Sequence, residues 1–516
     1  MLDVLIVGYG PVGQVTAILL AQRGWSVTVV EKWPEPFTMP RAVSFDGESA
    51  RVLAAAGVGD HIARFGEPSR DYVWRNAAGD TLLRVDVAEH GPCGWPDSTS
   101  MYQPGLEDRL AERGARQPGL RVLRGYRVES VTDHGDRVEV EAVGENTLRL
   151  TAKWVIGCDG ANSFVRERMG VGVTDLDFAS DWLTCDVVPH EPREFSPNNL
   201  QICDPARPST AVSAGPGHRR WEFMRLPGED LEEFNRIETA WRLLAPFDMT
   251  PDNATVQRHS VYRFQARFAD QWRVGRLLLA GDSAHLMPPF AGQGMCSGFR
   301  DAVNLAWKLD LVLANQADVA LLDTYTDERR AHVRHAIDMS VNLGKVICQP
   351  DAKAAADRDL VMIATRKRNE GRPQQQSAVY HPLTTGLLAE GTAAAGTLVP
   401  QGRIERDGRT GLLDDIVGHR FVLLVADDPR RLLTEEASAY LRDLDAEVVH
   451  VVPAGTRGGV VDVDGVYLSF LDKVKAVGVL VRPDFYAFGG ASDGIVLSEL
   501  VTIRLRGLLS PVALLS

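Results

Sequence analysis

The chain has 516 residues, of which 45% are hydrophobic and 24% are charged, a composition typical of globular proteins with two or three domains. Its formal net charge of −13 argues against nonspecific binding to nucleic acids or anionic membranes. Since the sequence shows neither a secretory leader nor an apolar run approaching the ~20 residues of a spanning helix, we expect a cytoplasmic protein with no nucleic-acid or membrane partner.

The N-terminal stretch predicts a strand, a glycine-rich turn and a helix. Residues 3–7 are an apolar, β-branched run typical of a buried parallel strand. Gly8-Tyr9-Gly10-Pro11-Val12-Gly13 follows directly, and Pro11 suits the first turn of a helix. A second strand, over residues 26–30, ends next to Glu31.

This glycine turn has the spacing of a dinucleotide-binding motif. Gly8 permits a tight turn, Gly10 lets the backbone approach a pyrophosphate, and Gly13 lets the helix lie close to the strand. The free N–H groups at the start of the helix then point toward the phosphates. Glu31, 18 positions after Gly13, can accept hydrogen bonds from a ribose diol. The motif does not decide between FAD and NAD.

A loop with Pro40-Arg41-Ala42 follows this unit. Arg41 can fold back over a pyrophosphate, although a loop arginine is more often simply solvated. Further along, Tyr102-Gln103-Pro104 precedes a helical pattern.

The next informative stretch is a predicted buried strand at 154–157, which breaks at Asp159-Gly160. From about residue 171 to residue 268 the pattern changes to short alternating strands with proline and glycine turns. We predict an inserted, mostly antiparallel sheet that covers a substrate pocket. Phe223 and Met224 are candidates to line that pocket.

A third stretch begins with an apolar strand pattern at 276–280 that runs into Gly281-Asp282. Asp282, at the end of a strand, is placed to bind a sugar or ribityl hydroxyl. His285, in the following turn, is either a catalytic base or a structural histidine.

A glycine-rich helix start follows Pro288-Pro289 and Phe290. The segment 292–296 leads into a helical pattern that continues to residue 313. The amides of Met295 and Cys296, backed by the helix dipole, can stabilise negative charge on a bound ring.

The remaining chain predicts a helical or linker region at 346–395 and then alternating strands and helices. Residues 372–376 are rich in proline and glutamine, which favours a linker or lid. All six cysteines precede residue 396, and their spacing is typical of neither disulfides nor zinc sites. We therefore expect reduced thiols and no metal site.

Three motifs stand in a fixed order along the chain: the turn at 8–13 with Glu31, Cys158-Asp159-Gly160 with Arg166, and Gly281-Asp282 with Pro288-Pro289, Gly292-Gln293-Gly294 and the run 301–309. Together they resemble the group A FAD-dependent aromatic hydroxylases, which have the para-hydroxybenzoate hydroxylase fold. Pro40-Arg41-Ala42, Gln103-Pro104 and the C-terminal extension are most similar to the 3-(3-hydroxyphenyl)propionate hydroxylases and phenol hydroxylase-like monooxygenases.

The resemblance implies an α/β fold. Residues 1–170 and 269–345 would form a discontinuous Rossmann-type FAD-binding domain, and 171–268 the inserted, mostly antiparallel substrate sheet. Residues 396–516 would form a thioredoxin-like domain without redox cysteines.

The same resemblance implies roles for individual residues. The ADP half of FAD would be held by Gly8, Gly10, Pro11, Val12, Gly13, Glu31 and Lys32. Arg41 and Gln103 would contact the pyrophosphate side, Asp282 the ribityl chain, and Asp159 both FAD and NAD(P)H. The isoalloxazine would be held by Pro289, Gly292, Gly294, Met295 and Cys296. The substrate would contact Phe223, Met224, Pro289 and Phe290. The family usually has asparagine at the position of Cys296.

The implied reaction is hydroxylation of a small aromatic substrate with NAD(P)H and O₂, through a flavin C4a-hydroperoxide. The oxygen would enter a ring carbon ortho or para to a phenol, in a site that excludes water. A group that deprotonates the phenol would activate the ring, but the sequence identifies no such catalytic residue. The resemblance also favours a homodimer.

Three alternatives remain open at this point. The substrate can be a larger polyketide or flavonoid phenol. The chain can instead be an FAD-binding protein without oxygenase activity, which is a different class of function. It can also be a reductase or dehydrogenase with the same fold, which incorporation of oxygen into the product would distinguish.

Overall fold

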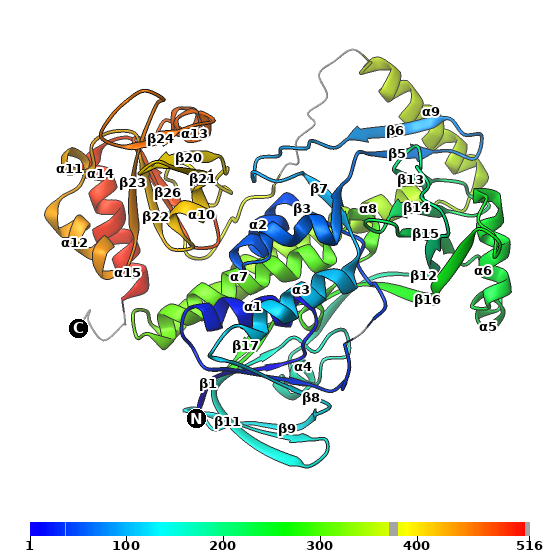
Figure 1. Ribbon diagram of the computed structural model, residues 1–516, viewed down its shortest axis with the longest axis horizontal. Coiled ribbons are helices and arrows are strands. Elements are labelled where there is room, and N and C mark those ends of the chain that lie inside the picture. The colour runs from blue at the N-terminus through cyan, green and yellow to red at the C-terminus, as the bar shows by residue number, and fades with distance from the viewer. Residues whose placement is uncertain (37, 371–379, 511–516) are drawn as a thin grey trace.

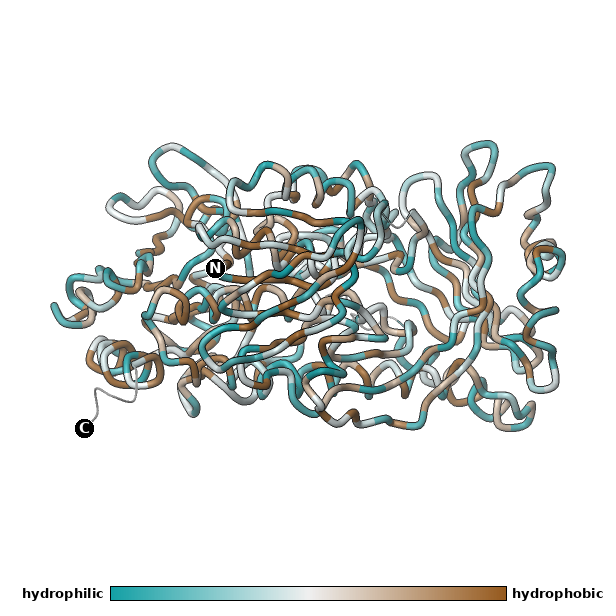
Figure 2. The backbone as a smooth tube through the Cα atoms, turned by 90° about the horizontal axis from the view of Figure 1, so that it is seen from below, coloured by the Kyte–Doolittle hydropathy of each residue, from teal (hydrophilic) through white to brown (hydrophobic). Residues whose placement is uncertain are grey.

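The computed structural model describes residues 1–36, 38–370 and 380–510. A central sheet with its helices lies between a second large sheet and a C-terminal domain (Figure 1). Hydrophobic segments follow the central strands, whereas the peripheral loops are mostly hydrophilic (Figure 2). Within the described part of the chain, no helix combines the length and apolar character needed to cross a bilayer.

The first sheet is built around β1 (Leu2–Val7), which pairs in parallel with β2 (Val27–Glu31) and β11 (Thr147–Gly157). Parallel strands β8 (Leu120–Arg124) and β18 (Leu277–Leu279) extend it on the two sides. The remaining strands are antiparallel: β9 (Arg127–Asp133), β10 (Val138–Val143) and β17 (Arg273–Val274). The carboxyl ends of β1, β2, β11 and β18 therefore meet at one edge, where the predicted cofactor residues follow them.

Helices cover this sheet. α1 (Pro11–Gln22) packs against α7 (Gly294–Leu313) and α3 (Gln103–Ala115). The other helices of this part are α2 (Gly47–Ala55), α4 (Phe164–Met169), α8 (Asp323–Ile347) and α9 (Ala352–Arg368). A small sheet combines β3 (Ser44–Asp46), β4 (Gly66–Pro68) and β7 (Ser98–Met101).

The second sheet has the order β19-β16-β12-β15-β14-β13-β5-β6. Its long antiparallel pair is β12 (Val173–Pro189) with β16 (Ala254–Ala269). The shorter strands are β13 (Asn199–Ile202), β14 (Ser209–Ser213), β15 (Arg219–Met224) and β19 (His285–Leu286). Helices α5 (Leu231–Phe234) and α6 (Ile237–Leu244) pack through Phe234, Ala240 and Leu244 on the face that carries Trp221.

The boundaries of this sheet differ from the predicted range 171–268. β5 (Asp71–Arg75) and β6 (Thr81–Asp86), which precede residue 170, complete it, because β13 pairs in parallel with β5. Pairing satisfies the backbone groups of β13 that an edge strand would expose. Partners more than a hundred residues apart leave no local pattern in the sequence.

The C-terminal domain contains a seven-stranded sheet. Its core is β22 (Val422–Val425), parallel to β23 (Glu447–Val452) and antiparallel to β25 (Gly478–Val481), which pairs antiparallel with β26 (Ala487–Ala491). Helices α12 (Glu435–Asp443) and α13 (Val466–Val474) provide connections. This strand order is thioredoxin-like, as predicted, and all six cysteines of the chain are free thiols outside this domain. The predicted linker segment 372–376 lies outside the described residues.

A buried ion network joins this domain to helices α7 and α8. The Arg482 guanidinium donates to Glu328 of α8 at 2.7 Å and to Asp484 at 2.6 Å. Lys308 of α7 lies 2.8 Å from the same Glu328 carboxylate, and all these side chains are almost fully buried. Although burial opposes it, the charges of Arg482 and Lys308 lower the pKa of Glu328 to about 2. The C-terminal domain is thus fixed directly on the helices that form the cofactor side of the molecule.

Candidate active site

The glycine turn between β1 and α1 leaves open space in front of the helix. Gly8 has a φ of +102°, and a Cβ there would lie 2.3 Å from the Cys158 carbonyl oxygen. A Cβ on Gly13 would lie 2.2 Å from the Gly8 oxygen, so both positions require glycine for packing. By contrast, a Cβ on Gly10 would meet nothing within 4 Å. With no side chain capping α1, this open cradle fits a dinucleotide pyrophosphate.

Glu31 lies beside this turn. Its Oε2 accepts from the N–H of Tyr9 at 2.8 Å, and its Oε1 accepts from the N–H of Trp33 at 2.9 Å. These bonds hold the carboxylate at the end of β2, where a ribose diol would lie in a bound dinucleotide. Lys32 is exposed, with its Nζ 5.5 Å from the Trp33 ring centroid.

Gln103 holds the backbone of the Arg41 loop. Its Oε1 accepts from the N–H groups of Arg41 at 2.9 Å and Ala42 at 2.7 Å, and its amide donates to Glu107 at 2.7 Å. From the second sheet, Arg220 donates to the carbonyl oxygens of Arg41 and Pro40. Gln103, predicted to contact the pyrophosphate side, therefore positions the loop, which is anchored to α3 and to the second sheet.

Asp159 organises the loop after β11. Its carboxylate accepts from the Ser163 hydroxyl at 2.5 Å and from the N–H of Val165 at 3.1 Å, and burial raises its pKa. Arg166 then donates to the carbonyls of Ala161 and Ser283, each at 2.7 Å. The Asp-Gly motif is in this way tied to the loop that carries Asp282.

Asp282 is an acceptor that the described residues leave unused. It lies in a short 3₁₀ turn (η3, Gly281–Ser283) directly after β18, and no described residue donates a hydrogen bond to its carboxylate. Burial raises its pKa, while the charges of His285 and Arg41 oppose the rise. A half-buried carboxylate without a protein donor fits a ribityl hydroxyl.

His285 occupies a structural position. Its buried Nε2 lies 2.7 Å from Asp301, and its ring packs against Trp272. Asp301 also accepts from Arg329 at 2.8 Å and from the N–H of Gly281 at 3.0 Å. Of the two roles left open by the sequence, this geometry supports the structural one, which positions the loop that carries Asp282.

The segment 292–296 forms the start of α7. Gly292 has a φ of +64°, which favours glycine, and the helix begins at Gly294 without a side-chain cap or an acidic residue in its first turn. The Cys296 thiol is buried, donates to the Gly292 carbonyl, and has its pKa raised to about 12 by burial. Residue 296 therefore offers a ligand its backbone amide and not its side chain, so the departure from asparagine affects an inward-facing side chain.

Two further residues bring these motifs together and were missed in the sequence. A Cβ on Gly298 of α7 would lie 2.5 Å from Cγ2 of Val12, and a Cβ on Gly281 would lie 3.0 Å from the same atom. Arg300 anchors the start of α7 by ion pairs to Asp46 and Glu48. The signal for Gly298 was its position one turn after Gly294 on the same helix.

The predicted substrate residues do not all share one face. Met224 and Phe290 are in a buried cluster with Trp182 and Phe264, where the Phe290 ring centroid lies 5.7 Å from Trp182 and 5.9 Å from Phe264. Phe223 points to the opposite face of β15 and packs with the α5–α6 side. Consecutive strand residues alternate between faces, so the structure does not bring Phe223 to this cluster. Pro289 begins the turn that carries Phe290.

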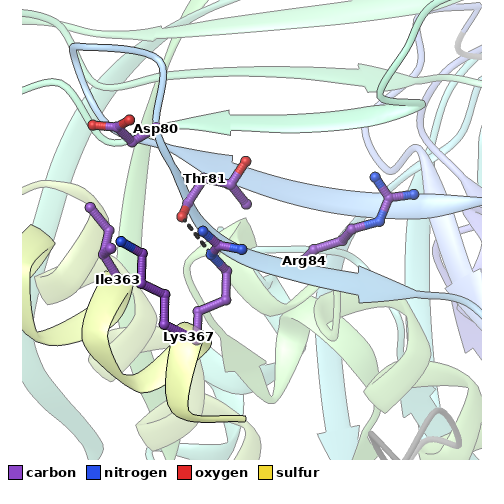
Figure 3. Close-up of a pocket in the computed structure, with 6 residues that line it drawn as sticks. Asp80, Thr81, Arg84, Ile363 and Lys367 are labelled. Carbon is purple, nitrogen blue, oxygen red and sulfur yellow. Dashed lines mark hydrogen bonds between the residues drawn. The ribbon is translucent and has the colours of Figure 1, made fainter. Parts of the chain in front are cut away.

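A surface cavity of about 440 Å³ lies elsewhere, between β6 and α9 (Figure 3). It is lined by Asp80, Thr81, Arg84, Ile363, Arg366 and Lys367. Arg366 donates to the Thr81 carbonyl at 3.1 Å. The lining includes none of the predicted cofactor or substrate residues, and its charged character differs from the mostly apolar lining of small-molecule sites.

Known protein families and relatives match this chain over most of its length. Residues 1–340 match a family model described as an FAD binding domain, and residues 396–502 match the HcaD C-terminal domain. A probable NADH-specific resorcinol 4-hydroxylase of Rhodococcus jostii (strain RHA1) is 39% identical, over 96% of this chain and 93% of its own length. The chain belongs to the FAD-dependent aromatic hydroxylases. It is an NAD(P)H-dependent flavoprotein monooxygenase, as the motifs predicted.

One further relative and two solved structures are also similar to the chain. A 3-(3-hydroxy-phenyl)propionate/3-hydroxycinnamic acid hydroxylase of Comamonas testosteroni is 33% identical over 95% of this hydroxylase and 94% of its own length. The flavin-dependent monooxygenase PieE in complex with FAD and substrate has a TM-score of 0.81 at 20% identity, with 98% of this chain and 99% of that chain covered. Aklavinone-11 hydroxylase, in a ternary complex with FAD and aklavinone, has a TM-score of 0.78 at 24% identity, with the same coverage. These two structures confirm the predicted fold.

Proposed function

We propose that this hydroxylase acts on a small, uncharged, single-ring phenol of the resorcinol type, with NADH as reductant. The observation that carries the proposal is the similarity to the Rhodococcus protein, which extends over both domains. The residue assignments for FAD, the cytoplasmic location and the homodimer are part of the same proposal.

The charges on the second sheet favour an uncharged phenol over a phenylpropionate. Arg220 donates to Asp186 at 2.7 Å, and Arg258 donates to the Pro40 carbonyl. Both arginines thus have partners, whereas Glu222 on the same face is a carboxylate to which no described residue donates a hydrogen bond. A substrate carboxylate would be repelled there.

The chain's own residues bind the cofactor and the substrate, orient them and exclude water. Bound FAD supplies the transfer of electrons from NADH and of one oxygen atom from O₂ to the ring. The N-terminus of α1 would offer its amides to the phosphates, and that of α7 to the isoalloxazine ring. Asp282 would accept a hydrogen bond from a ribityl hydroxyl. The buried cluster of Trp182, Phe264 and Phe290, the aromatic wall, would exclude water from one side of the substrate site.

A substrate panel tests this proposal. NADH oxidation by the purified yellow protein is measured with resorcinol, with 3-(3-hydroxyphenyl)propionate and with a polycyclic phenol, and products are identified by mass. We expect resorcinol to give the fastest coupled hydroxylation. Faster hydroxylation of the propionate or of the polycyclic phenol would refute the substrate assignment. Bound FAD that NADH and NADPH never reduce would support the alternative of a protein without oxygenase activity.

A further inference from the structure

The face of the second sheet that carries Met224 also carries a band of polar side chains. In the antiparallel register, Met224, Glu222 and Arg220 of β15 lie opposite Trp182, Thr184 and Asp186 of β12. Side chains directly opposite each other in a sheet share a face. The aromatic wall at Trp182 is therefore followed, two residues along each strand, by Thr184 and Glu222.

The band continues over the neighbouring strands. Thr210 of β14 lies opposite Glu222, and its hydroxyl donates to Gln201 of β13 at 2.8 Å. The Tyr72 hydroxyl of β5 donates to the same Gln201 oxygen at 3.3 Å. Burial raises the pKa of Tyr72, and the charge of Glu222 adds to the rise.

Glu222 is the unsatisfied member of this band. Its side chain is only 13% exposed, and the nearest guanidinium nitrogen, Nη1 of Arg220, lies 3.8 Å from its Oε1, beyond hydrogen-bond distance. No described residue donates a hydrogen bond to the carboxylate, and burial raises its pKa. This largely buried carboxylate has an ion-pair neighbour but no protein hydrogen-bond donor, so it can accept a hydrogen bond from a ligand.

The same face is turned toward the cofactor loops. Arg220 and Arg258 donate to carbonyls of the Arg41 loop, and Arg41 acts on the pKa of both Tyr262 of β16 and Asp282. Phe290, one of the wall residues, stands two positions before Gly292. Along β12 and β15, Thr184 and Glu222 therefore lie between the aromatic cluster at Trp182 and the pair Asp186–Arg220, of which Arg220 holds the Arg41 loop.

We propose that Glu222 accepts the hydrogen bond of the substrate's ring hydroxyl and takes its proton, an assignment that rests on the proposed function. The O–H bond of the phenol breaks, the proton moves to a carboxylate oxygen of Glu222, and the electron pair stays on the phenolate oxygen. The phenolate directs electron density to the ortho and para carbons, which are the positions that accept oxygen. The role is that of a general base for a neutral phenol.

The test compares the holoprotein with Glu222→Gln and with the control Glu232→Gln, an exposed position on α5. Retained flavin absorption and thermal unfolding establish that each variant is folded. We expect E222Q to reduce kcat for resorcinol by about 10²–10⁴-fold, with stimulated NADH oxidation diverted to H₂O₂. E232Q should match the wild type.

The pH profile and a binding probe separate base catalysis from a structural role. The charged and titratable groups that face Glu222 are Arg220 on its own strand, Asp186, Arg258 and Tyr72. We expect the acidic limb of kcat/KM to disappear in E222Q. At a pH at which free 4-nitrophenol is neutral, its binding should generate the visible phenolate band in the wild type but not in E222Q.

The outcomes distinguish the role of Glu222 from the proposed substrate class. Equal kcat/KM, equal pH profile and equal phenolate band in E222Q and wild type would overturn the role of Glu222 while leaving the hydroxylase assignment intact. A wild type that turns over no phenol yet forms the nitrophenolate band through Glu222 would refute the proposed substrate class alone. A wild type that neither binds nor oxidises any phenol would overturn both.

Discussion

Val12 of α1 fills the space that Gly298 of α7 leaves open. A Cβ on Gly298 would lie 2.5 Å from Cγ2 of Val12 and 3.2 Å from the Cα of Gly281. Three segments that are predicted to hold FAD, the turn at 8–13, the turn at 281–283 and the start of α7, therefore depend on one contact. Gly298 controls how closely the two helix N-termini approach each other.

Gly298→Ala should weaken FAD binding and destabilise the protein. Overpacking in a well-packed core costs about 1–3 kcal/mol, and here it separates α1 from α7. Flavin retention on dilution and thermal unfolding measure both effects. Val12→Ala removes the clashing methyl group, so the double variant should recover much of the flavin binding. G298A with unchanged flavin affinity would contradict this account of the contact.

Glu31→Gln should lower FAD affinity without unfolding the protein. A hydrogen bond to a charged group contributes about 1.5–3 kcal/mol, which corresponds to about 10–100-fold in affinity. The matched control is Glu35→Gln, an exposed position four residues further on. Titration of apoprotein with FAD, followed by flavin fluorescence, gives the two affinities. Equal affinities would remove Glu31 from the ribose site.

Arg482→Met should loosen the C-terminal domain from the rest of the chain. The change leaves Glu328 and Asp484 buried without their guanidinium partner, which costs about 3–5 kcal/mol in such pairs. Arg403→Met is the control, because its ion pair with Asp464 is exposed. Thermal unfolding and limited proteolysis between the domains report the result. Identical melting of R482M and R403M would mean that the buried network contributes little.

His332 should make the protein less stable in acid. Its Nδ1 accepts from Arg329 at 2.7 Å, and its Nε2 lies 3.0 Å from the His381 carbonyl, an arrangement that requires the neutral ring. Burial, together with the charge of Arg329, lowers the pKa of His332 well below its usual value. Its contribution is therefore complete above the unfolded pKa of about 6.5 and is lost as the pH falls below it.

The measurement is the free energy of unfolding between pH 7 and pH 5. One such group changes it by at most about 1.4 kcal/mol per pH unit, and His332→Gln, which can donate and accept but does not titrate, should flatten the dependence. The exposed His190→Gln should leave the slope unchanged. A slope that H332Q does not alter would exclude His332 as a source.

The sequence predicted those parts of the site that depend on local pattern. The glycine turn, Glu31 at the end of β2 and Asp282 after β18 are each fixed by a strand and the few residues that follow it. The thioredoxin-like strand order likewise follows from successive elements. Comparison with relatives confirmed the family, the fold and the cofactors that these motifs implied.

The remainder depends on contacts between distant segments. That β5 joins β13, that Gln103 holds the Arg41 backbone, and that Gly298 meets Val12 are all set by tertiary packing. Phe223 was proposed as a pocket residue because its strand was recognised without its register, and a shift of one residue changes the face of a strand. Glu222 was missed for the same reason.

The monooxygenase activity is tested most directly by finding the source of the oxygen atom in the product. Purified protein is given resorcinol, NADH and isotopically labelled O₂, and the product is analysed by mass spectrometry. For a monooxygenase we expect a product with one added hydroxyl group that carries the label, formed in step with NADH consumption. NADH consumption that yields only H₂O₂ with every phenol of the panel, or a hydroxyl without the label, would contradict it.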